Sequence, residues 1–418
     1  MPLKRRLYPQ LIEDVSRREI GVVIGPRQVG KTTLLKAIQR YYQKAKILSR
    51  YFNLEIPSDA HFFAQPPQNI LDDFSKAKLA LLIDEFHYLP NATKLFKAIY
   101  DGYPKLKVFA SGSSALEMHK HLKESLAGRR RLYRVYPLSF SEWLPSRNLR
   151  TKLPHQFNVK LSPSTHRILR KHLETFVIFG GMPGLVHEKT NEDKKRLLLD
   201  LVATYIQKDV KALLREEDIL SFNRLLVLLA SQEGNLFSEL AVSRDLNYSL
   251  RQVRKDISIL NQMFLIDVLK PFFTNRTREL KQTNKVYFFD AGIRNAVLRD
   301  FRLLNARPDK GALLESFVLH EIQKNMNVSQ DIYYWRTREK DEVDFILVQD
   351  RVPLAVEVKS KLKGPEIPQG VRQFLRKYTE CRTVVILNDD LLKEISFEDK
   401  RVLFAPHYFA FLIPSLSM

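Results

Sequence analysis

Short apolar runs alternate with stretches of helical spacing over the first 145 residues of the chain. Ile20–Ile24, Leu79–Ile83 and Lys107–Ala110 are apolar runs of strand length, whereas Lys31–Tyr42 and Lys94–Tyr100 repeat their apolar positions every three to four residues. Strands that alternate with helices need crossover connections, and these make neighbouring strands parallel. The pattern therefore predicts an α/β fold with a parallel sheet in residues 1–145.

Residues 216–290 follow the order of a winged helix-turn-helix. Three helical stretches precede two strand-like runs, at Phe222–Ala230, Phe237–Leu246, Leu250–Met263, Phe264–Leu269 and Lys285–Phe289. Asn247 supplies a turn before the third helix, and Ser249 is a suitable N-cap. A short turn before the third helix and a hairpin after it are typical of a winged helix. Residues 146–215 show helical spacing broken by glycine and proline, which predicts an all-helical subdomain.

Residues 291–418 predict a second α/β unit with a mixed sheet. One helical stretch precedes three strand-like runs, and a helix and a strand follow, at Ala312–Lys324, Ile332–Arg336, Val343–Val348, Leu354–Lys359, Gln369–Lys377 and Thr383–Leu387. We therefore expect four domains, with the boundaries 1–145, 146–215, 216–290 and 291–418.

Composition narrows the possible classes of protein. With 44% apolar residues and 14 glycines, the chain can bury real cores and is neither disordered nor fibrous. Its single cysteine, Cys381, excludes an internal disulfide framework and a Cys-rich zinc site. No apolar run approaches the ~18–20 residues that a bilayer requires, so we expect no membrane segment and a soluble, cytoplasmic protein.

Charge points to a polyanionic partner. Lys and Arg number 68 against 47 Asp and Glu, for a net charge of +21. Such a field attracts polyanions, of which nucleic acid is the commonest. The alternative is an ordinary basic protein whose lysines only solvate it.

The segment Gly25–Thr32 fits G-x-x-x-x-G-K-[ST] between an expected strand and an expected helix. Backbone N–H groups must converge on phosphate oxygens, so glycine allows close approach and the helix N-terminus adds positive potential. We expect Lys31 to reach the β- and γ-phosphates of ATP and the Thr32 hydroxyl to join the Mg²⁺ shell. The other loop positions expected to bind phosphate are Gly25, Gln28, Val29 and Gly30. The alternative is a glycine turn that caps a helix.

Four further positions are candidates for the metal site or for catalysis. Asp84 and Glu85 end an apolar strand, where Asp84 is expected to hold Mg²⁺ and Glu85 to polarise the attacking water; two acids at a strand end are otherwise a turn. Ser111 ends the next strand, where it either senses the γ-phosphate or caps a turn. Arg129 is a candidate for transition-state charge in its own chain or in a neighbouring subunit, against a solvated or polyanion-contacting face.

Taken in order, these motifs resemble a widespread group of prokaryotic AAA-type ATPases whose C-terminal half is a domain of unknown function. The matching stretches are GPRQVGKTT (Gly25–Thr33), LLIDEFHYLP (Leu81–Pro90), SGSSALEM (Ser111–Met118), LAGR (Leu126–Arg129), YPLSFSEW (Tyr136–Trp143), FGGMPGLV (Phe179–Val186), YIQKDV (Tyr205–Val210), KVYFFDAGIRNAVL (Lys285–Leu298), YWR (Tyr334–Arg336), EVDF (Glu342–Phe345) and AVEVKS (Ala355–Ser360). The resemblance implies an ASCE-type ATPase core that binds ATP and Mg²⁺, a helical lid, a winged helix and a C-terminal nuclease-like fold. It extends the nucleotide site to Thr33. Serine at position 111 departs from the threonine common there.

A second set of acids lies in the last domain. Glu315 on an expected helix, Asp344 on one strand, and Glu357 with Lys359 on the next resemble the PD-(D/E)xK nuclease constellation. In that chemistry the acids hold Mg²⁺ and Lys359 positions water or stabilises charge. The alternatives are a surface strand with an ion pair and an inactive nuclease-like scaffold.

The leading hypothesis is an Mg²⁺-dependent ATPase whose nucleotide state controls a DNA-binding winged helix and the nuclease-like domain. Arg251, Arg254 and Lys255 on the third helix are the expected DNA contacts. Basic residues around the wing reinforce them, namely Arg276, Arg278, Lys281 and Lys285. The alternative is a nucleotide-gated protein-interaction switch with an inactive nuclease-like scaffold and no role in DNA binding. A homo-oligomer is possible in either case.

Overall fold

The computed structural model describes residues 3–74, 79–89, 91–112, 126–147, 151–205, 216–273 and 283–417. The chain divides into two compact units, and each is described by itself. Unit 1 comprises residues 1–137 and 258–265, and unit 2 comprises residues 138–257 and 266–418. Within the described ranges, no helix has the length and apolar character needed to cross a bilayer.

Unit 1 is built on a five-stranded parallel sheet. Its strands are β1 (Ile20–Ile24), β2 (Leu48–Asn53), β3 (Leu79–Asp84), β4 (Leu106–Gly112) and β5 (Arg130–Arg134). They lie in the order β2-β3-β4-β1-β5, and each neighbouring pair is parallel. This confirms the predicted parallel α/β core. Because β4 lies between β1 and β3, the ends of three strands that precede candidate residues are adjacent.

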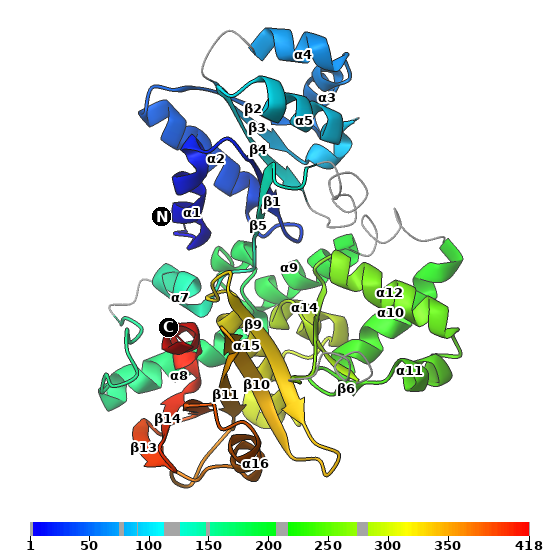
Figure 1. Ribbon diagram of the computed structural model, residues 1–418. Helices are drawn as coiled ribbons and strands as arrows, with labels where there is room; N and C mark the ends of the chain where they lie inside the picture. The colour runs from blue at the N-terminus through cyan, green and yellow to red at the C-terminus, as the bar shows by residue number, and fades with distance from the viewer. Residues whose placement is uncertain are drawn as a thin grey trace. The chain divides into compact units, whose positions relative to one another are not determined.

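Helices cover both faces of this sheet (Figure 1). Chain order takes α2 (Lys31–Lys44) from β1 to β2 and α5 (Ala92–Gly102) from β3 to β4, in opposite directions across the sheet. Right-handed crossovers then place the two helices on opposite faces. The remaining helices of unit 1 are α1 (Leu7–Glu13), α3 (Pro57–Phe63) and α4 (Pro67–Phe74).

Burial explains why the apolar pattern predicted the strands β1, β3 and β4 but did not predict β5. The residues of β1, β3 and β4 are all buried, as expected for central strands covered on both faces. The edge strand β5 has the sequence RRLYR, and its apolar pattern did not predict a strand. Asp14 compensates for its charge, since it accepts a hydrogen bond from Arg131 at 2.5 Å and another from the Tyr133 hydroxyl.

Unit 2 contains the predicted mixed sheet. Its six strands are β9 (Gln330–Arg336), β10 (Glu342–Gln349), β11 (Val352–Val358), β12 (Thr383–Asn388), β13 (Lys393–Phe397) and β14 (Lys400–Pro406), in the order β13-β14-β12-β11-β10-β9. The pairs β9–β10, β10–β11 and β13–β14 are antiparallel, and β11–β12 and β12–β14 are parallel. Two helices belong to this region, α15 (Lys310–Gln323) and α16 (Gln369–Lys377).

The remainder of unit 2 is mainly helical. Its helices are α7 (Phe140–Trp143), α8 (Pro163–Phe179), α9 (Asn191–Thr204), α10 (Glu216–Ser231), α11 (Glu239–Leu246) and α14 (Ala291–Leu298). The helix α12 (Leu250–Gln262) begins in this unit, and a three-stranded sheet joins β6 (Leu236–Phe237), β8 (Asn284–Phe288) and β7 (Ile266–Leu269) in that order. Helices and strands thus follow the order predicted for residues 216–290.

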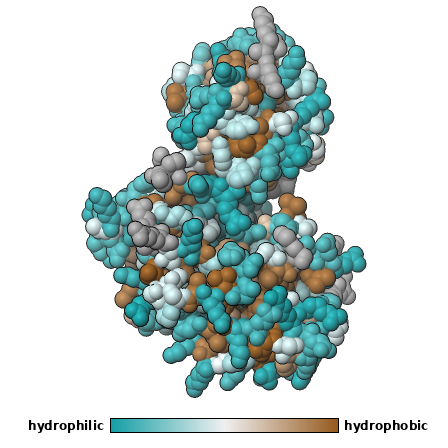
Figure 2. Space-filling model, turned by 90° about the vertical axis from the view of Figure 1, so that its left-hand side faces the viewer, coloured by the Kyte–Doolittle hydropathy of each residue, from teal (hydrophilic) through white to brown (hydrophobic). Residues whose placement is uncertain are grey.

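The predicted cap at Ser249 is confirmed, since its hydroxyl accepts a hydrogen bond from the Gln252 backbone N–H at 3.1 Å. Asp290 caps the start of α14, where it accepts a hydrogen bond from the Ile293 backbone N–H. Asp290 also accepts a hydrogen bond from the Gly181 backbone at 2.7 Å, so it joins α14 to the segment after α8. On the face drawn in Figure 2, hydrophilic residues cover most of the surface and hydrophobic residues form small separate groups.

Candidate functional site

The segment Gly25–Thr32 forms the loop between β1 and α2. Gly30 precedes the helix with φ 96°, in the left-handed region that glycine tolerates without strain. A Cβ atom at Gly25 would overlap the carbonyl oxygen of Val135, so only glycine fits there. Gln28 also has a left-handed conformation, with φ 61°. The loop therefore turns sharply onto a helix N-terminus, as the sequence predicted.

Lys31 is the first residue of α2, and its side chain is buried within the loop. Its Nζ donates hydrogen bonds to the carbonyl oxygens of Gly25 at 3.1 Å and Pro26 at 2.9 Å. Only 5% of the residue is exposed. An ammonium group held beside backbone N–H groups at a helix N-terminus concentrates positive charge where a phosphate chain binds in such loops.

Asp84 accepts hydrogen bonds from three hydroxyl groups at the carboxyl ends of the strands. Its Oδ2 accepts hydrogen bonds from Thr32 Oγ1 at 2.6 Å and from the Tyr51 hydroxyl at 2.7 Å, and its Oδ1 accepts one from Ser111. Burial and then the hydrogen bond to Asp84 raise the pKa of Tyr51. The structure thus brings together Thr32, Asp84 and Ser111, which come from α2, β3 and β4.

Sequence reasoning missed Tyr51. Its strand β2 pairs with β3 in a register that places Asn53 opposite Asp84, so a side chain two residues earlier reaches the carboxylate. No motif marks this tyrosine. Only the strand order brings β2 beside β3, and the apolar pattern does not contain that order.

Glu85 follows Asp84 and turns away from the strand in a left-handed conformation, with φ 54°. Its Oε2 lies 3.3 Å from His87 Nδ1, within ion-pair distance but without hydrogen-bond geometry. Burial alone would raise the pKa of the Glu85 carboxyl, but the His87 ring and the charges of Lys31 and Arg27 outweigh it and lower that pKa. Glu85 is therefore an ionised carboxylate near the loop, the state that a group orienting water requires.

Arg5 supports the loop from the N-terminal segment. Its Nη1 donates to the Val29 carbonyl oxygen at 2.7 Å, and its Nη2 donates to the Tyr136 carbonyl oxygen at 2.5 Å. The Val29 carbonyl belongs to the phosphate loop, so Arg5 ties the loop to the segment that follows β5. The sequence showed only a basic stretch at this position.

Arg129 does not join this cluster in its own chain. Its backbone oxygen bonds to the N–H of Ile20, at the start of β1, whereas the loop follows the end of β1. Five residues of strand span roughly 16 Å. The Arg129 side chain pairs instead with Asp101, at 2.9 Å. A role toward a neighbouring subunit stays a prediction, as does the alternative of a solvated or polyanion-contacting face.

The donor set at the loop suits Mg²⁺. The Thr32 hydroxyl and the Asp84 carboxylate are hard oxygen donors, and the 2.6 Å bond between them brings them close enough to share one ion. Mg²⁺ in nucleotide sites is held by one or two protein oxygens together with phosphate oxygens. The remaining predicted loop residues lie around this pair, with Val29 buried and Thr33 exposed on α2.

The expected DNA contacts on α12 are exposed, as a nucleic-acid surface requires. Arg251, Arg254 and Lys255 are all exposed. Arg254 Nε pairs with Glu239 of α11 at 2.7 Å, which neutralises part of the positive charge. Of the four wing residues, Arg276, Arg278 and Lys281 lie outside the described residues. Lys285 is 2% exposed, so the expectation that it contacts DNA is wrong.

The C-terminal acids partly converge. Continued from Phe345↔Val356, the register of β10 and β11 sets Asp344 opposite Glu357, and Glu357 Oε2 accepts a hydrogen bond from the Asp344 backbone N–H at 3.4 Å. Lys359 Nζ lies 2.6 Å from Glu357 Oε1. Burial and then the charge of Asp344 raise the pKa of both Glu315 and Glu357. The predicted residues therefore face a common region.

Lys285 brings a positive charge to this region from β8. Its Nζ forms an ion pair with Glu342, whose other oxygen lies 2.6 Å from Arg336 Nη1. Burial would lower the pKa of Lys285, but the charges of Glu315, Glu342 and Asp344 outweigh it and raise that pKa. The Tyr287 hydroxyl donates to Glu315 at 3.5 Å. Among the residues that the structure describes, no three His, Cys, Asp or Glu side chains are arranged to hold a metal ion.

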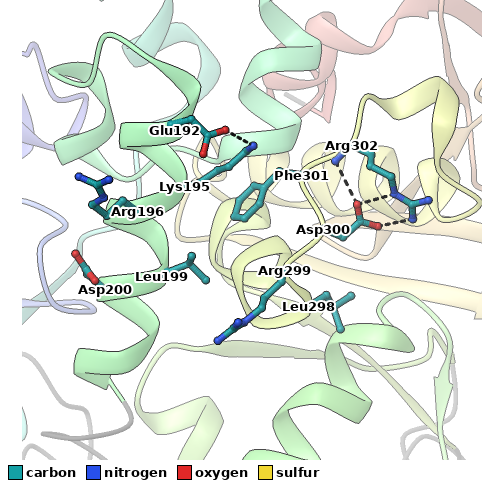
Figure 3. A pocket seen from close by; sticks show the side chains of 10 residues that line it. All are labelled: Glu192, Lys195, Arg196, Leu199, Asp200, Leu298, Arg299, Asp300, Phe301 and Arg302. Atoms are coloured by element: carbon teal, nitrogen blue, oxygen red, sulfur yellow. Dashed lines mark hydrogen bonds and ion pairs between the residues drawn. The ribbon is translucent and has the colours of Figure 1, made fainter.

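A separate cavity of about 870 Å³ lies between α9 and the residues after α14. Figure 3 shows that two of its cations are held by acids of the same wall, Lys195 by Glu192 at 2.6 Å and Arg302 by Asp300 at 2.7 Å. None of the predicted site residues lines it.

Comparisons with known proteins bear on the first domain. A model of the AAA domain family matches residues 17–144, which contain the loop, both acids and Ser111. Residues 17–144 are therefore similar to the AAA domain. Two further models, each described as a domain of unknown function, match residues 170–303 and 310–408.

Relatives of similar length carry no assigned activity. An uncharacterized protein of Mycobacterium tuberculosis is 24% identical over 92% of this chain and 79% of its own length. Another, from Methanocaldococcus jannaschii, is 24% identical over 91% of this chain and 85% of its own. Among solved structures, the Aeropyrum pernix ORC2 protein has a TM-score of 0.39 at 11% identity, covering 71% of this chain and 92% of that one.

Proposed function

We propose that the protein is an Mg²⁺-dependent ATPase. One observation carries this proposal: Lys31, Thr32, Asp84 and Ser111 meet at the carboxyl edge of a parallel sheet, beside a loop that opens a helix. The loop N–H groups and Lys31 bind the phosphates, and Thr32 and Asp84 hold Mg²⁺, which neutralises phosphate charge when bound. Glu85 orients the attacking water, and Ser111 positions Asp84.

Two substitutions test this assignment. Lys31→Ala removes the ammonium group, so we expect nucleotide binding to be lost. Glu85→Gln keeps the shape of the side chain but removes its charge, so we expect ATP to bind while turnover falls by 10²-fold or more, the usual scale for a positioned base. Calorimetry with Mg-ATP and phosphate release measure the two effects. Wild-type turnover in both variants would contradict the proposal.

We further propose that the nucleotide state controls a DNA-binding winged helix and a nuclease-like domain. The exposed cations of α12 and the order of α10, α11, α12, β7 and β8 support the first part. The pairing of Asp344, Glu357 and Lys359 supports the second. The alternative, an interaction switch without DNA, predicts no binding of duplex DNA even at low salt.

Nuclease chemistry has its own test. The Asp344–Glu357 pair supplies carboxylate oxygens of the kind that Mg²⁺ or Mn²⁺ binds, and Lys359 carries positive charge beside them. We expect supercoiled plasmid to be nicked when Mg²⁺ or Mn²⁺ is added, and Glu357→Ala to abolish the nicking. If the purified chain leaves the plasmid intact with both metals, the C-terminal domain is an inactive scaffold.

A further inference from the structure

We propose that a groove lined by Lys359, Arg372 and Arg376 binds the phosphodiester backbone of a DNA strand beside the C-terminal acids. The groove is distinct from α12 and occupies about 590 Å³. This inference rests on the proposed DNA partner and is independent of ATP hydrolysis.

The groove runs between the end of β11 and the exposed face of α16. Lys359 lies at one wall, immediately after β11, and Arg372, Gln373 and Arg376 of α16 form another. Glu366 is the single acid among the lining residues. Two glutamines, Gln369 and Gln373, add neutral hydrogen-bonding groups of the kind that contact phosphate and sugar oxygens.

Packing of α16 determines where these arginines point. Val371, Phe374 and Leu375 are buried in the core of the mixed sheet, with Trp335 and Val343 in the same cluster. On a helix with one buried face, Arg372 and Arg376 lie together on the opposite, exposed face. They are one turn apart, about 6 Å along the axis. This spacing is comparable to that of consecutive phosphates in one strand.

Charge favours a polyanion here over a neutral or cationic partner. Three cations line the groove against one acid, and Lys359 is also paired with Glu357, which does not line the groove. In the described part of the chain, neither Arg372 nor Arg376 takes part in an ion pair. The cavity in Figure 3 differs, because Lys195, Arg196, Arg299 and Arg302 face three acids, Glu192, Asp200 and Asp300. An unpaired guanidinium group keeps its full attraction for phosphate oxygens.

Lys359 connects the groove with the acids. Its Nζ is 2.6 Å from Glu357 Oε1, while 40% of its side chain is exposed. A strand that lies on the two arginines therefore passes Lys359 and reaches the edge where Asp344 and Glu357 meet. Because these contacts involve only the backbone of the strand, the groove binds DNA without sequence preference.

The test compares two double variants of the full-length chain. Binding of a labelled duplex is measured over a salt series in EDTA, which prevents any cleavage. Each phosphate contact contributes about 0.9 to the slope of log K against log salt. We expect Arg372→Gln/Arg376→Gln to lower that slope by about 2 and to weaken binding uniformly across duplex sequences.

A matched control removes the same charge elsewhere. Arg302→Gln/Arg401→Gln deletes two exposed arginines that are paired with Asp300 and Glu394. We expect it to leave the salt slope unchanged. An equal fall in the salt slope of both double variants would show a general charge effect and would contradict DNA binding in the groove.

Two other results would also overturn the groove. In the first, Arg372→Gln/Arg376→Gln binds duplex as tightly as the wild type, whereas Arg251→Gln/Lys255→Gln loses duplex affinity. This result would assign duplex binding to α12 alone. In the second, the wild type does not bind duplex, which would also contradict the proposal that DNA is a partner. Phosphate release from Mg-ATP, measured on the same protein preparations in a separate buffer with Mg²⁺ and without EDTA, shows whether the ATPase proposal stands in each case.

Discussion

Single residues give the nucleotide site its shape, and several of them lie far from the loop in sequence. Asp84 receives hydroxyl groups from Thr32, Tyr51 and Ser111, all within hydrogen-bonding distance. Three donors hold the carboxylate in one orientation. In the proposed function, such a group is already in place to share a metal ion with bound nucleotide.

Arg5 stabilises the conformation of the loop itself. Arg5→Ala removes two charge-assisted hydrogen bonds, to the Val29 and Tyr136 carbonyl oxygens. Part of the binding energy of ATP must then be spent on ordering the loop, so we expect the Kd for Mg-ATP to rise about tenfold, or ~1.4 kcal/mol. Calorimetry measures the change.

Arg6→Ala is the matched control for this prediction, because it removes the same charge one residue along the chain. We expect its Kd to stay close to the wild-type value. An unchanged Kd in Arg5→Ala would show that the loop keeps its conformation without the arginine.

At the scale of elements, the sequence predicted what local patterns encode. The apolar runs that became β1, β3 and β4 are buried on both faces, so their composition was diagnostic. The range predicted for α16, Gln369–Lys377, is the range observed, because its apolar residues recur with helical spacing. The phosphate loop and the acid pair were predictable because each depends on residues adjacent in the chain.

Features that depend on contacts between segments distant in the chain could not be predicted from local sequence patterns. The strand β5 is rich in arginine, and it exists because β1 offers a parallel partner and Asp14 neutralises Arg131. Lys285 was expected on a DNA-facing wing, yet Glu342 draws it into the acid cluster. Neither partner lies near the residue in sequence, so no local pattern indicates the contact.

At the scale of the whole molecule, the chain forms two compact units, and a probe confined to unit 2 measures how far ligand binding to unit 1 affects it. The protein's two tryptophans, Trp143 and Trp335, both belong to unit 2, so their fluorescence reports the unfolding of that unit alone. Far-UV circular dichroism reports both units. A ligand that binds a folded unit stabilises it by ~2.7 kcal/mol at 100 times its Kd.

We therefore expect Mg-ATP to raise the thermal midpoint seen by circular dichroism by more than it raises the midpoint of the tryptophan transition. Lys31→Ala should abolish the shift. Should both probes move together on addition of Mg-ATP, the two units unfold as one cooperative block.

The division of unit 1 along the chain has a practical consequence for dissecting the protein. Residues 258–265 belong to this unit although they follow residue 137 by more than a hundred positions, and Leu260, Met263 and Leu265 among them are buried. A recombinant fragment that stops at residue 137 therefore loses part of its own interior and exposes the apolar surface that those side chains cover. Such a fragment should aggregate on expression, and its insolubility would not mean that the proposed nucleotide site is incompetent. Deletion mapping of this protein needs point substitutions in the intact polypeptide instead.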